Sequence, residues 1–399
     1  MDILFRRESP PIAVARTAAD IRKAIESNWN EYLSRYANLF SSNYVEGSSP
    51  PSVFVGSYGY PRVLVGPMVP PVHGNTTVMD LPESWVGKGL EDIVNYRLSL
   101  VRGIQPVKAQ EPSGRYIESL QELAMSTHST DSEMEFVKSA RAHSFVDSEN
   151  APFGPVGEIK SAKFSNSPSD ANIQKMYYDK DLLAQDAVLE LYNRGIEVSK
   201  IQKCFSIGMF GKSRKLVPTR WSITATDDII SKSLVEEIVT FGAIDSCGVY
   251  SFSHLGNLYA VVLFPGRWMF EMQEAWYDNE GNIGFGSAFE DANGLAHYPE
   301  TAGAHFASRL AVAEHLFSQK VQAGALVLRE IRPEYAVPVG VWQVREGVRM
   351  ALKQRPAIVS SFEEGLDFAC RGLSVDKKEW LARSGLQNAR KQKSIKDFF

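Results

Sequence analysis

The sequence lacks the cysteine pattern of a zinc-binding or disulfide-rich protein. Its three cysteines, Cys204, Cys247 and Cys370, lie far apart, and no two of them form a C-x-x-C pair. Zinc ribbons and zinc fingers need closely spaced pairs, so a structural zinc site of that kind is excluded. A sparse, odd cysteine count also argues against a disulfide framework and predicts a reducing, cytoplasmic setting.

Long hydrophobic runs and an excess of one charge are lacking as well. No stretch of about 18 apolar residues occurs, which excludes a membrane-spanning helix, and residues 1–12 have no apolar core of a secretory signal. The 43 Lys and Arg against 47 Asp and Glu give a net charge of −4. A uniformly basic, histone-like binder is therefore excluded, although a local basic patch is not. We expect a soluble protein without a membrane partner.

Length and residue patterning predict an α+β fold. The 399 residues suit about two domains. Apolar spacings of three and four predict helices over 301–321 and 342–353, and Ser361 with Glu364 predicts a helix start at Phe362. Runs of β-branched and aromatic residues predict a hairpin over 52–66 and a meander over 248–276. Strands and helices do not alternate strictly, so we expect mixed helices and antiparallel β-meanders rather than a doubly wound sheet.

The last eight residues carry the strongest functional signal. Ile395, Phe398 and Phe399 fall at i, i+3 and i+4, so one helical turn would gather them into an apolar plug, with Gln392 one turn earlier. Large apolar side chains at a charged chain end are a liability unless a partner covers them. The pattern resembles the PCNA-interacting peptide (PIP motif) of sliding-clamp partners. In that peptide the three apolar anchors dock in a clamp pocket, and the glutamine occupies a smaller neighbouring pocket.

The charge around this tail supports a clamp partner. Residues 371–399 contain eight Lys or Arg against three Asp or Glu, in a chain that is negative overall. Basic flanks would speed the encounter with an acidic clamp surface. The alternative is a terminal amphipathic turn that packs back on its own domain.

A second signal is the basic stretch from Lys203 to Arg220, which contains no acidic residue. Part of it, residues 206–213, is a P-loop pattern with serine in place of the first glycine. A P-loop needs a helix that continues from its Lys-Ser pair, and Pro218 arrives too soon for one. We therefore predict phosphate contacts to nucleic acid instead, with a plain solvated basic face as the alternative. The candidate residues are Lys212, Arg214, Lys215 and Arg220.

The glycine-rich hairpin over residues 47–62 is a third candidate. Tyr58, Tyr60 and Arg62 lie at or beside its turn, where they could stack on or contact a nucleic acid strand. A tight hairpin whose tyrosines pack against the protein is the alternative.

An enzyme acting on nucleic acid or on a nucleotide is the competing function. Thr226 followed by Asp227 and Asp228 predicts a helix start, and a basic strand carrying Lys215 and Arg220 would feed into it, a geometry that suits a phosphate. The sequence shows no nucleophile–base pair and no metal set, so no reaction can be named and no cofactor is predicted. A pure adaptor without DNA contact is the third option.

Three internal stretches carry a family resemblance. They are Ser49–Gly56 with Gly59–Pro61 and Gly66–Met68, then Lys212–Asp228, and finally Gly340–Arg345. Together with the tail they resemble the archaeal Nre family, and the resemblance covers essentially the whole chain. It implies a DNA repair protein that binds the sliding clamp PCNA. It also implies a larger N-terminal domain over 1–285, a smaller C-terminal domain over 286–384 and a basic tail over 385–399 carrying the clamp peptide.

The chain departs from the family at its start. Many members begin with a four-cysteine, zinc-finger-like segment, whereas residues 5–12 contain no cysteine. No zinc role is therefore carried over from the family. If DNA is bound, some other surface has to bind it.

Overall fold

The computed structural model describes residues 42–141, 153–277 and 283–391, together with Ser27, Asn30, Glu31 and Ser34 of an earlier helix. The chain forms two compact units. The N-terminal unit comprises Lys23–Ile230 and Val337–Gly340, and the C-terminal unit contains Ser231–Ala336 and the chain from Val341 onward. Helix α8, Thr219–Ile238, contains the point at which the chain passes from one unit to the other.

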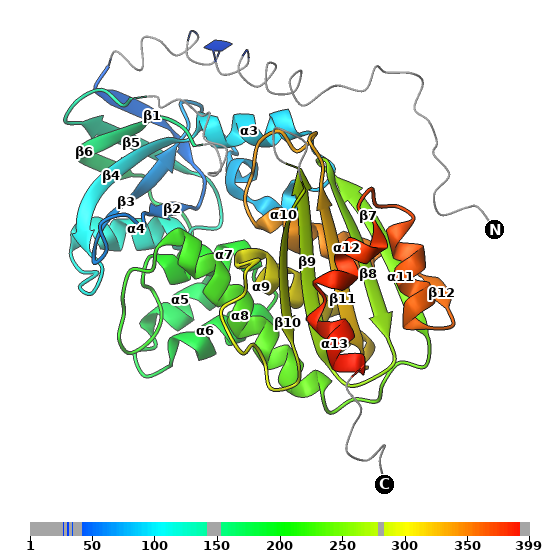
Figure 1. The fold of residues 1–399 in the computed structure, drawn as a ribbon. Coiled ribbons are helices and arrows are strands. Elements are labelled where there is room, and N and C mark those ends of the chain that lie inside the picture. Colours follow the sequence, from blue (N-terminus) through cyan, green and yellow to red (C-terminus); the bar gives the residue numbers. More distant parts are fainter. Residues whose placement is uncertain are drawn as a thin grey trace. The chain divides into compact units, whose positions relative to one another are not determined.

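The N-terminal unit contains a six-stranded mixed sheet in the order β1-β5-β6-β4-β3-β2 (Figure 1). Its strands are β1 (Tyr44–Ser49), β2 (Val53–Val55), β3 (Arg62–Val69), β4 (Val101–Lys108), β5 (Thr130–Phe136) and β6 (Val156–Phe164). Only the β4–β6 pair is parallel within this described sheet. The predicted hairpin is confirmed as β2 and β3, with Phe54 opposite Gly66. Val69, Val101 and Met134 are buried in the core of this sheet.

Five α-helices with described bounds accompany this sheet, in addition to the earlier helix that contains Ser27 and to the start of α8. They are α3 (Leu90–Ser99), α4 (Arg115–Met125), α5 (Ala171–Tyr178), α6 (Ala184–Asn193) and α7 (Val198–Ser206). Helix α4 buries Ile117, Leu120 and Ala124 at spacings of three and four, as an amphipathic helix does. Helix α5 starts where the Asp170 side chain accepts hydrogen bonds from two backbone amides.

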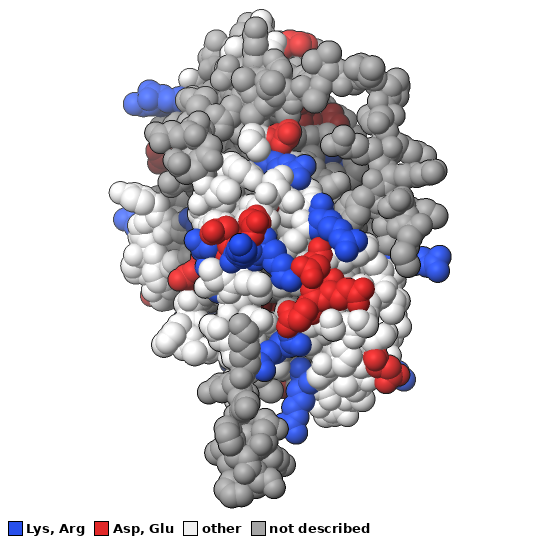
Figure 2. All heavy atoms as spheres, turned by 45° about the vertical axis from the view of Figure 1, so that its right-hand side comes forward, with Lys and Arg blue, Asp and Glu red and all other residues white. Residues whose placement is uncertain are grey.

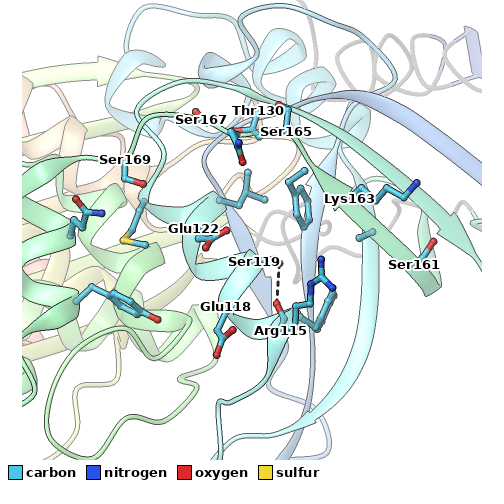
Figure 3. Close-up of a pocket in the computed structure, with 18 of the residues that line it drawn as sticks. Arg115, Glu118, Ser119, Glu122, Thr130, Ser161, Lys163, Ser165, Ser167 and Ser169 are labelled. Atoms are coloured by element: carbon cyan, nitrogen blue, oxygen red, sulfur yellow. Dashed lines mark hydrogen bonds between the residues drawn. The ribbon is translucent and has the colours of Figure 1, made fainter.

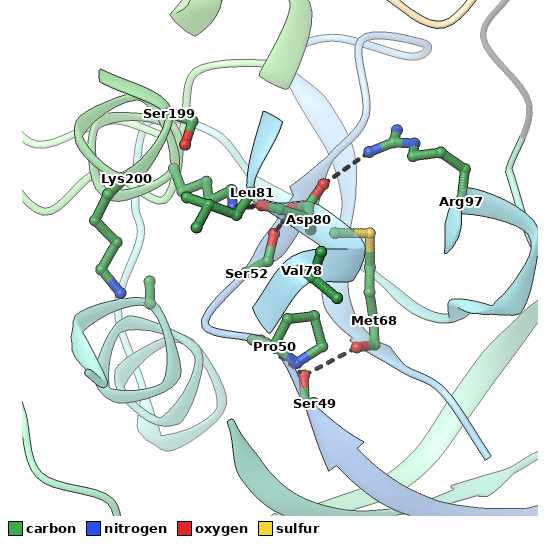
Figure 4. Close-up of polar contacts among 12 residues, drawn as sticks. Ser49, Pro50, Ser52, Met68, Val78, Asp80, Leu81, Arg97, Ser199 and Lys200 are labelled. Carbon is green, nitrogen blue, oxygen red and sulfur yellow. Dashed lines mark hydrogen bonds and ion pairs between the residues drawn. The ribbon is translucent and has the colours of Figure 1, made fainter. Parts of the chain in front are cut away.

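A buried carboxylate ties β2 to two helices of the same unit. Asp80 accepts hydrogen bonds from the Ser52 hydroxyl and, at 2.8 Å, from Arg97 Nη1, and Figure 4 shows both side chains converging on it. Lys203 Nζ lies 3.1 Å from the second carboxylate oxygen. Burial raises the pKa of Asp80, but the charges of Lys203 and Arg97 and the Ser52 hydrogen bond outweigh burial and lower the pKa below its usual value.

The C-terminal unit contains a second six-stranded mixed sheet, in the order β10-β9-β11-β8-β7-β12. Its strands are β7 (Cys247–His254), β8 (Asn257–Phe264), β9 (Met269–Tyr277), β10 (Ile283–Glu290), β11 (Gly324–Ile331) and β12 (Ala357–Val359). The α+β class is thus confirmed. The meander over 248–276 differs in one respect, because β11 lies between β8 and β9 and is parallel to β9. Leu326, Val327 and Leu328 are all buried, and such a continuous apolar run favours the middle of a sheet.

Helices cover both faces of this sheet. They are α9 (Gly303–Gln319), α10 (Trp342–Leu352), α11 (Phe362–Cys370), α12 (Lys377–Ala382) and α13 (Gly385–Lys391). In Figure 1, α12 and α13 lie in front of the strands, whereas α9 and α10 lie behind them. The predicted start of α11 is confirmed, since the Ser361 hydroxyl accepts the backbone N–H of Glu364 at 3.2 Å.

Candidate nucleic-acid interface

Backbone hydrogen bonds bring three distant segments of the N-terminal unit together. The amide of Ala109, just after β4, donates to the carbonyl of Pro61, just before β3, at 2.8 Å. The amide of Leu216 donates to the carbonyl of Ala109 at 2.7 Å. The start of β3, the end of β4 and the basic loop before α8 therefore form one surface.

Aromatic rings stand on this surface. The rings of Tyr60 and Trp221 have centroids 5.3 Å apart at an interplanar angle of 52°. Tyr60 is 44% exposed, Trp221 is 49% exposed and Tyr58, at the hairpin turn, is 91% exposed. The first turn of α8 is fixed beside β2, because the amide of Val55 donates to the Thr219 hydroxyl at 3.1 Å. Tyr60 and Trp221 thus pack against each other and remain accessible.

Exposed cations lie on the same segments as these rings. Arg62 and Lys108 are direct partners across the β3–β4 pair, and both are exposed. Arg220 is exposed next to Trp221, and Lys215 is exposed next to Leu216. Lys108 Nζ lies 3.8 Å from Glu111, but both side chains are largely exposed, so water and salt screen this pair. We call these residues the hairpin surface: Tyr58, Tyr60, Arg62, Lys108, Lys215, Arg220 and Trp221.

The combination of rings and cations suits a nucleic acid strand. Exposed aromatic faces stack on bases without regard to sequence, and guanidinium and ammonium groups neutralise phosphates. The hairpin surface offers both within one compact unit.

The other basic residues of the 203–220 stretch differ in their surroundings. Arg214 turns toward the protein, where its guanidinium carbon lies 4.8 Å above the Tyr177 ring and its Nη2 donates to the Tyr177 carbonyl. Lys203 pairs with the buried Asp80. Lys212 is exposed in the same loop, so its phosphate contact stays a prediction together with those of Lys215 and Arg220.

The predicted helix start at Asp227 is wrong. Helix α8 already begins at Thr219, because the amides of Trp221 and Ser222 both bond the carbonyl of Pro218 and open the first turn. Asp227 lies inside the helix, fully buried, and accepts a hydrogen bond from Gln202 Nε2 at 3.0 Å. The competing enzyme hypothesis placed a phosphate at a helix N-terminus beside Asp227. No helix begins there, so this phosphate site is not formed.

Sequence reasoning missed two members of the hairpin surface. The stretch containing Trp221 reads as a strand, since it is rich in β-branched and aromatic residues, and only the helical turn after Pro218 turns the indole toward Tyr60. No sequence motif singles out Lys108. Its role depends on the β3–β4 register that places it opposite Arg62.

The four PIP-motif residues lie outside the described residues. They are Gln392, Ile395, Phe398 and Phe399. The preceding helix α13 is anchored to the C-terminal unit, because Glu271 accepts hydrogen bonds from the Ser384 hydroxyl at 2.6 Å and from the Gly385 amide at 2.7 Å. The guanidinium of Arg390 also lies 4.0 Å above the Phe362 ring. The candidate clamp peptide thus follows a fixed helix.

Carboxylates accompany several cations near this helix. Lys377 pairs with Asp367 at 2.5 Å, and Arg383 pairs with Glu379 at 2.9 Å. Figure 2 shows that Lys and Arg lie among Asp and Glu on the face it draws. Because Asp367 lies outside residues 371–399, its pairing with Lys377 neutralises part of the positive charge excess counted for that segment.

No group of three or more His, Cys, Asp or Glu side chains among the described residues could hold a metal ion. No helix in the described ranges is long and apolar enough to cross a lipid bilayer.

Comparisons with known proteins match both parts of the chain to the same family. The family model described as archaeal Nre, N-terminal, matches residues 22–280, and the model described as archaeal Nre, C-terminal, matches residues 290–398. DNA repair protein NreB of Archaeoglobus fulgidus is 38% identical over 88% of this chain and 91% of its own length. DNA repair protein NreA of the same organism is 36% identical over 88% and 89%. DNA repair protein NreA of Haloferax volcanii is 31% identical over 96% of each chain.

Proposed function

Because this chain belongs to the archaeal Nre family, whose relatives are named DNA repair proteins, we propose that it is a DNA repair factor that binds DNA through the hairpin surface. The sliding clamp PCNA, engaged by the C-terminal PIP motif, recruits it to its sites of action. The observation that carries the DNA contact is the Tyr60–Trp221 ring pair among Arg62, Lys108 and Arg220.

DNA contact and clamp recruitment are separate parts of the proposal. A surface of rings and cations binds a strand through stacking and phosphate neutralisation, and neither needs a particular base sequence. Such a contact suits a protein that meets DNA of any sequence. A surface without base-sequence preference cannot direct the protein to a particular place on DNA. Binding to the sliding clamp would direct it instead.

Fluorescence anisotropy with labelled single-stranded DNA tests the DNA contact. The full chain is compared with an Arg62→Glu, Arg220→Glu variant and with a Lys232→Glu variant that reverses a charge elsewhere. We expect the first variant to lose most of its affinity and the control to keep it. Equal affinities for all three proteins would contradict the DNA-binding part.

Calorimetry with archaeal PCNA tests recruitment. The full chain is compared with a chain ending at Arg390 and with a Ser394→Ala variant, whose change lies between the anchors. Burying one aliphatic and two aromatic side chains contributes roughly 1.5–3 kcal/mol each before ordering costs, so we expect affinity in the micromolar range. The shortened chain should lose this heat signal, while Ser394→Ala should retain it. Unchanged binding by the shortened chain would exclude the tail as the recruiting element.

A further inference from the structure

A cluster of charged side chains in the N-terminal unit carries more positive than negative charge. Arg97 Nη1 lies 2.8 Å from one carboxylate oxygen of Asp80, and Lys203 Nζ lies 3.1 Å from the other. Arg102, the second residue of β4, is close enough to Asp80 and Arg97 for their charges to shift its pKa. Three cations against one carboxylate leave an excess of positive charge. We call Asp80, Arg97, Arg102 and Lys203 the Asp80 cluster.

Arg102 has no acidic partner of its own. Its guanidinium carbon lies 4.3 Å from the centre of the Phe54 ring and 4.6 Å from that of Phe153. Within the described residues no carboxylate forms an ion pair with it, and its guanidinium donates no hydrogen bond. The two rings attract the cation, but they offer no oxygen to its N–H donors. The guanidinium is thus held by the rings while its donors remain unused.

Arg97 also has an unused donor. Its Nη1 donates to Asp80 at 2.8 Å, whereas its Nε is buried and has no hydrogen-bond partner in the described part of the chain. A buried N–H without an acceptor destabilises the fold, because it has lost its hydrogen bonds to water. A second anion beside Asp80 would supply the acceptor.

The charge of Arg102 is unfavourable without such an anion. Burial lowers the pKa of Arg102 and the like charge of Arg97 lowers it further, whereas the charge of Asp80 raises it. The side chains of Arg97 and Lys203 are 21% and 14% exposed, and Arg102 is partly exposed. A small anion can therefore reach the cluster from solvent.

The large hollow beside α4 has no comparable excess of charge. It measures about 1300 Å³, and its charged lining residues are Arg115, Glu118, Glu122 and Lys163. Figure 3 shows the two glutamates projecting from α4, with Lys163 on β6 beyond them. Two cations balance two carboxylates there, and all four residues are exposed. An anion is therefore attracted more strongly to the Asp80 cluster than to this hollow.

We propose that the Asp80 cluster binds a phosphate monoester through the guanidinium groups of Arg97 and Arg102. The planar fork of a guanidinium matches two phosphate oxygens and forms short, charge-assisted hydrogen bonds with them. A phosphate monoester carries about 1.5–2 negative charges at neutral pH, which balances the excess of the cluster, whereas a phosphate within a DNA strand carries a single charge. The ligand is therefore the terminal phosphate of a nucleotide or of a DNA end.

Calorimetry with deoxyadenosine 5′-monophosphate and with deoxyadenosine tests the site. We expect heat from the nucleotide and none from the nucleoside, which lacks the phosphate. Arg102→Gln should weaken nucleotide binding about tenfold or more, since hydrogen bonds to a charged group are lost. Arg102→Lys keeps the charge without the fork and should weaken it less. Arg194→Gln, at an exposed position of the same unit, is the matched control and should bind as the wild type does.

Short oligonucleotides with a 5′-phosphate or a 5′-hydroxyl identify the source of the phosphate. Tighter binding of the phosphorylated strand in anisotropy, lost in Arg102→Gln, assigns the site to DNA ends. Equal binding of both strands, together with heat from the free nucleotide, assigns it to a nucleotide. Equal heats from nucleotide and nucleoside, together with equal binding of both strands, overturn the inference.

The phosphate site is separate from the hairpin surface. Arg102 lies six residues before Lys108 along β4, which corresponds to about 20 Å in an extended strand. The Arg62→Glu, Arg220→Glu variant should therefore bind the nucleotide as the wild type does, even where it loses single-stranded DNA. Loss of nucleotide binding in this variant would contradict a separate site at the Asp80 cluster.

Discussion

Tyr60 and Trp221 lie with ring centroids 5.3 Å apart, although one belongs to the β2–β3 hairpin and the other to the first turn of α8. Both rings remain about half exposed. A ring pair that served only the core would be covered, so this contact positions aromatic faces at the surface. It joins two segments that the family resemblance had singled out separately.

Replacing Trp221 with alanine should weaken single-stranded DNA binding by roughly tenfold or more. Stacking of a base on an aromatic side chain contributes about 1–3 kcal/mol, and the indole is the larger of the two paired rings. Titration by anisotropy measures the change. Tyr298→Ala removes a 72% exposed ring from the other unit and should leave affinity unchanged. The same loss in both variants would argue against a specific role for the hairpin surface.

Charge reversal at Arg62 or Arg220 should lower the salt dependence of DNA binding. Each phosphate contact adds close to one unit to the slope of log K against log salt, so each substitution should reduce the slope by about one. Affinities measured over a range of salt concentrations give this slope. A weaker complex with an unchanged slope would mean that these residues do not neutralise phosphates.

Asp80→Asn should destabilise the protein at neutral pH by about 3–5 kcal/mol, because it leaves the cations of Lys203 and Arg97 without their buried carboxylate. The pKa of Asp80 is lowered in the folded state, so the folded protein binds fewer protons at this site than the unfolded chain. Its contribution is therefore complete above the ordinary Asp pKa of about 3.9 and is lost as the pH falls through the folded value.

Urea unfolding of the wild-type protein and the Asp80→Asn variant over a range of pH checks this dependence. The difference in the free energy of unfolding should shrink toward acid pH. Glu158→Gln, at an exposed position, should show little difference at any pH. A constant difference between the wild type and Asp80→Asn would mean that the charge of Asp80 does not stabilise the fold.

Gly66→Ala should destabilise the N-terminal unit strongly. A Cβ on Gly66 would lie 1.8 Å from the backbone oxygen of Gly103 in the neighbouring strand β4, so the strands would have to separate. Overpacking costs about 1–3 kcal/mol when side chains can yield, and backbone atoms yield less. Thermal unfolding measures the effect. Gly242→Ala, where nothing lies within 4 Å of the added carbon, should unfold at the wild-type temperature.

Local patterns predicted many of the elements. The strand–turn–strand signal over residues 52–66 became β2 and β3, and the Ser361 cap opens α11 as expected. These features depend on the conformational preferences of neighbouring residues, which the sequence contains directly. The α8 start was mispredicted, because Thr226 followed by two aspartates is typical of a helix N-terminus. In the fold, Thr226 and Asp227 are both buried inside the helix, and Asp227 accepts a hydrogen bond from Gln202.

The sequence by itself determined the α+β class, the family membership and the terminal peptide pattern, because these depend on residue type and spacing along the chain. Only the tertiary structure decided which cations share a surface. Lys203 and Arg214 face inward to Asp80 and Tyr177, while Arg62, Lys108 and Arg220 are exposed on the segments that hydrogen bonds and the Tyr60–Trp221 contact bring together. Side chains far apart in the sequence meet through strand register and loop packing, and these follow from burial of the whole core rather than from any local motif.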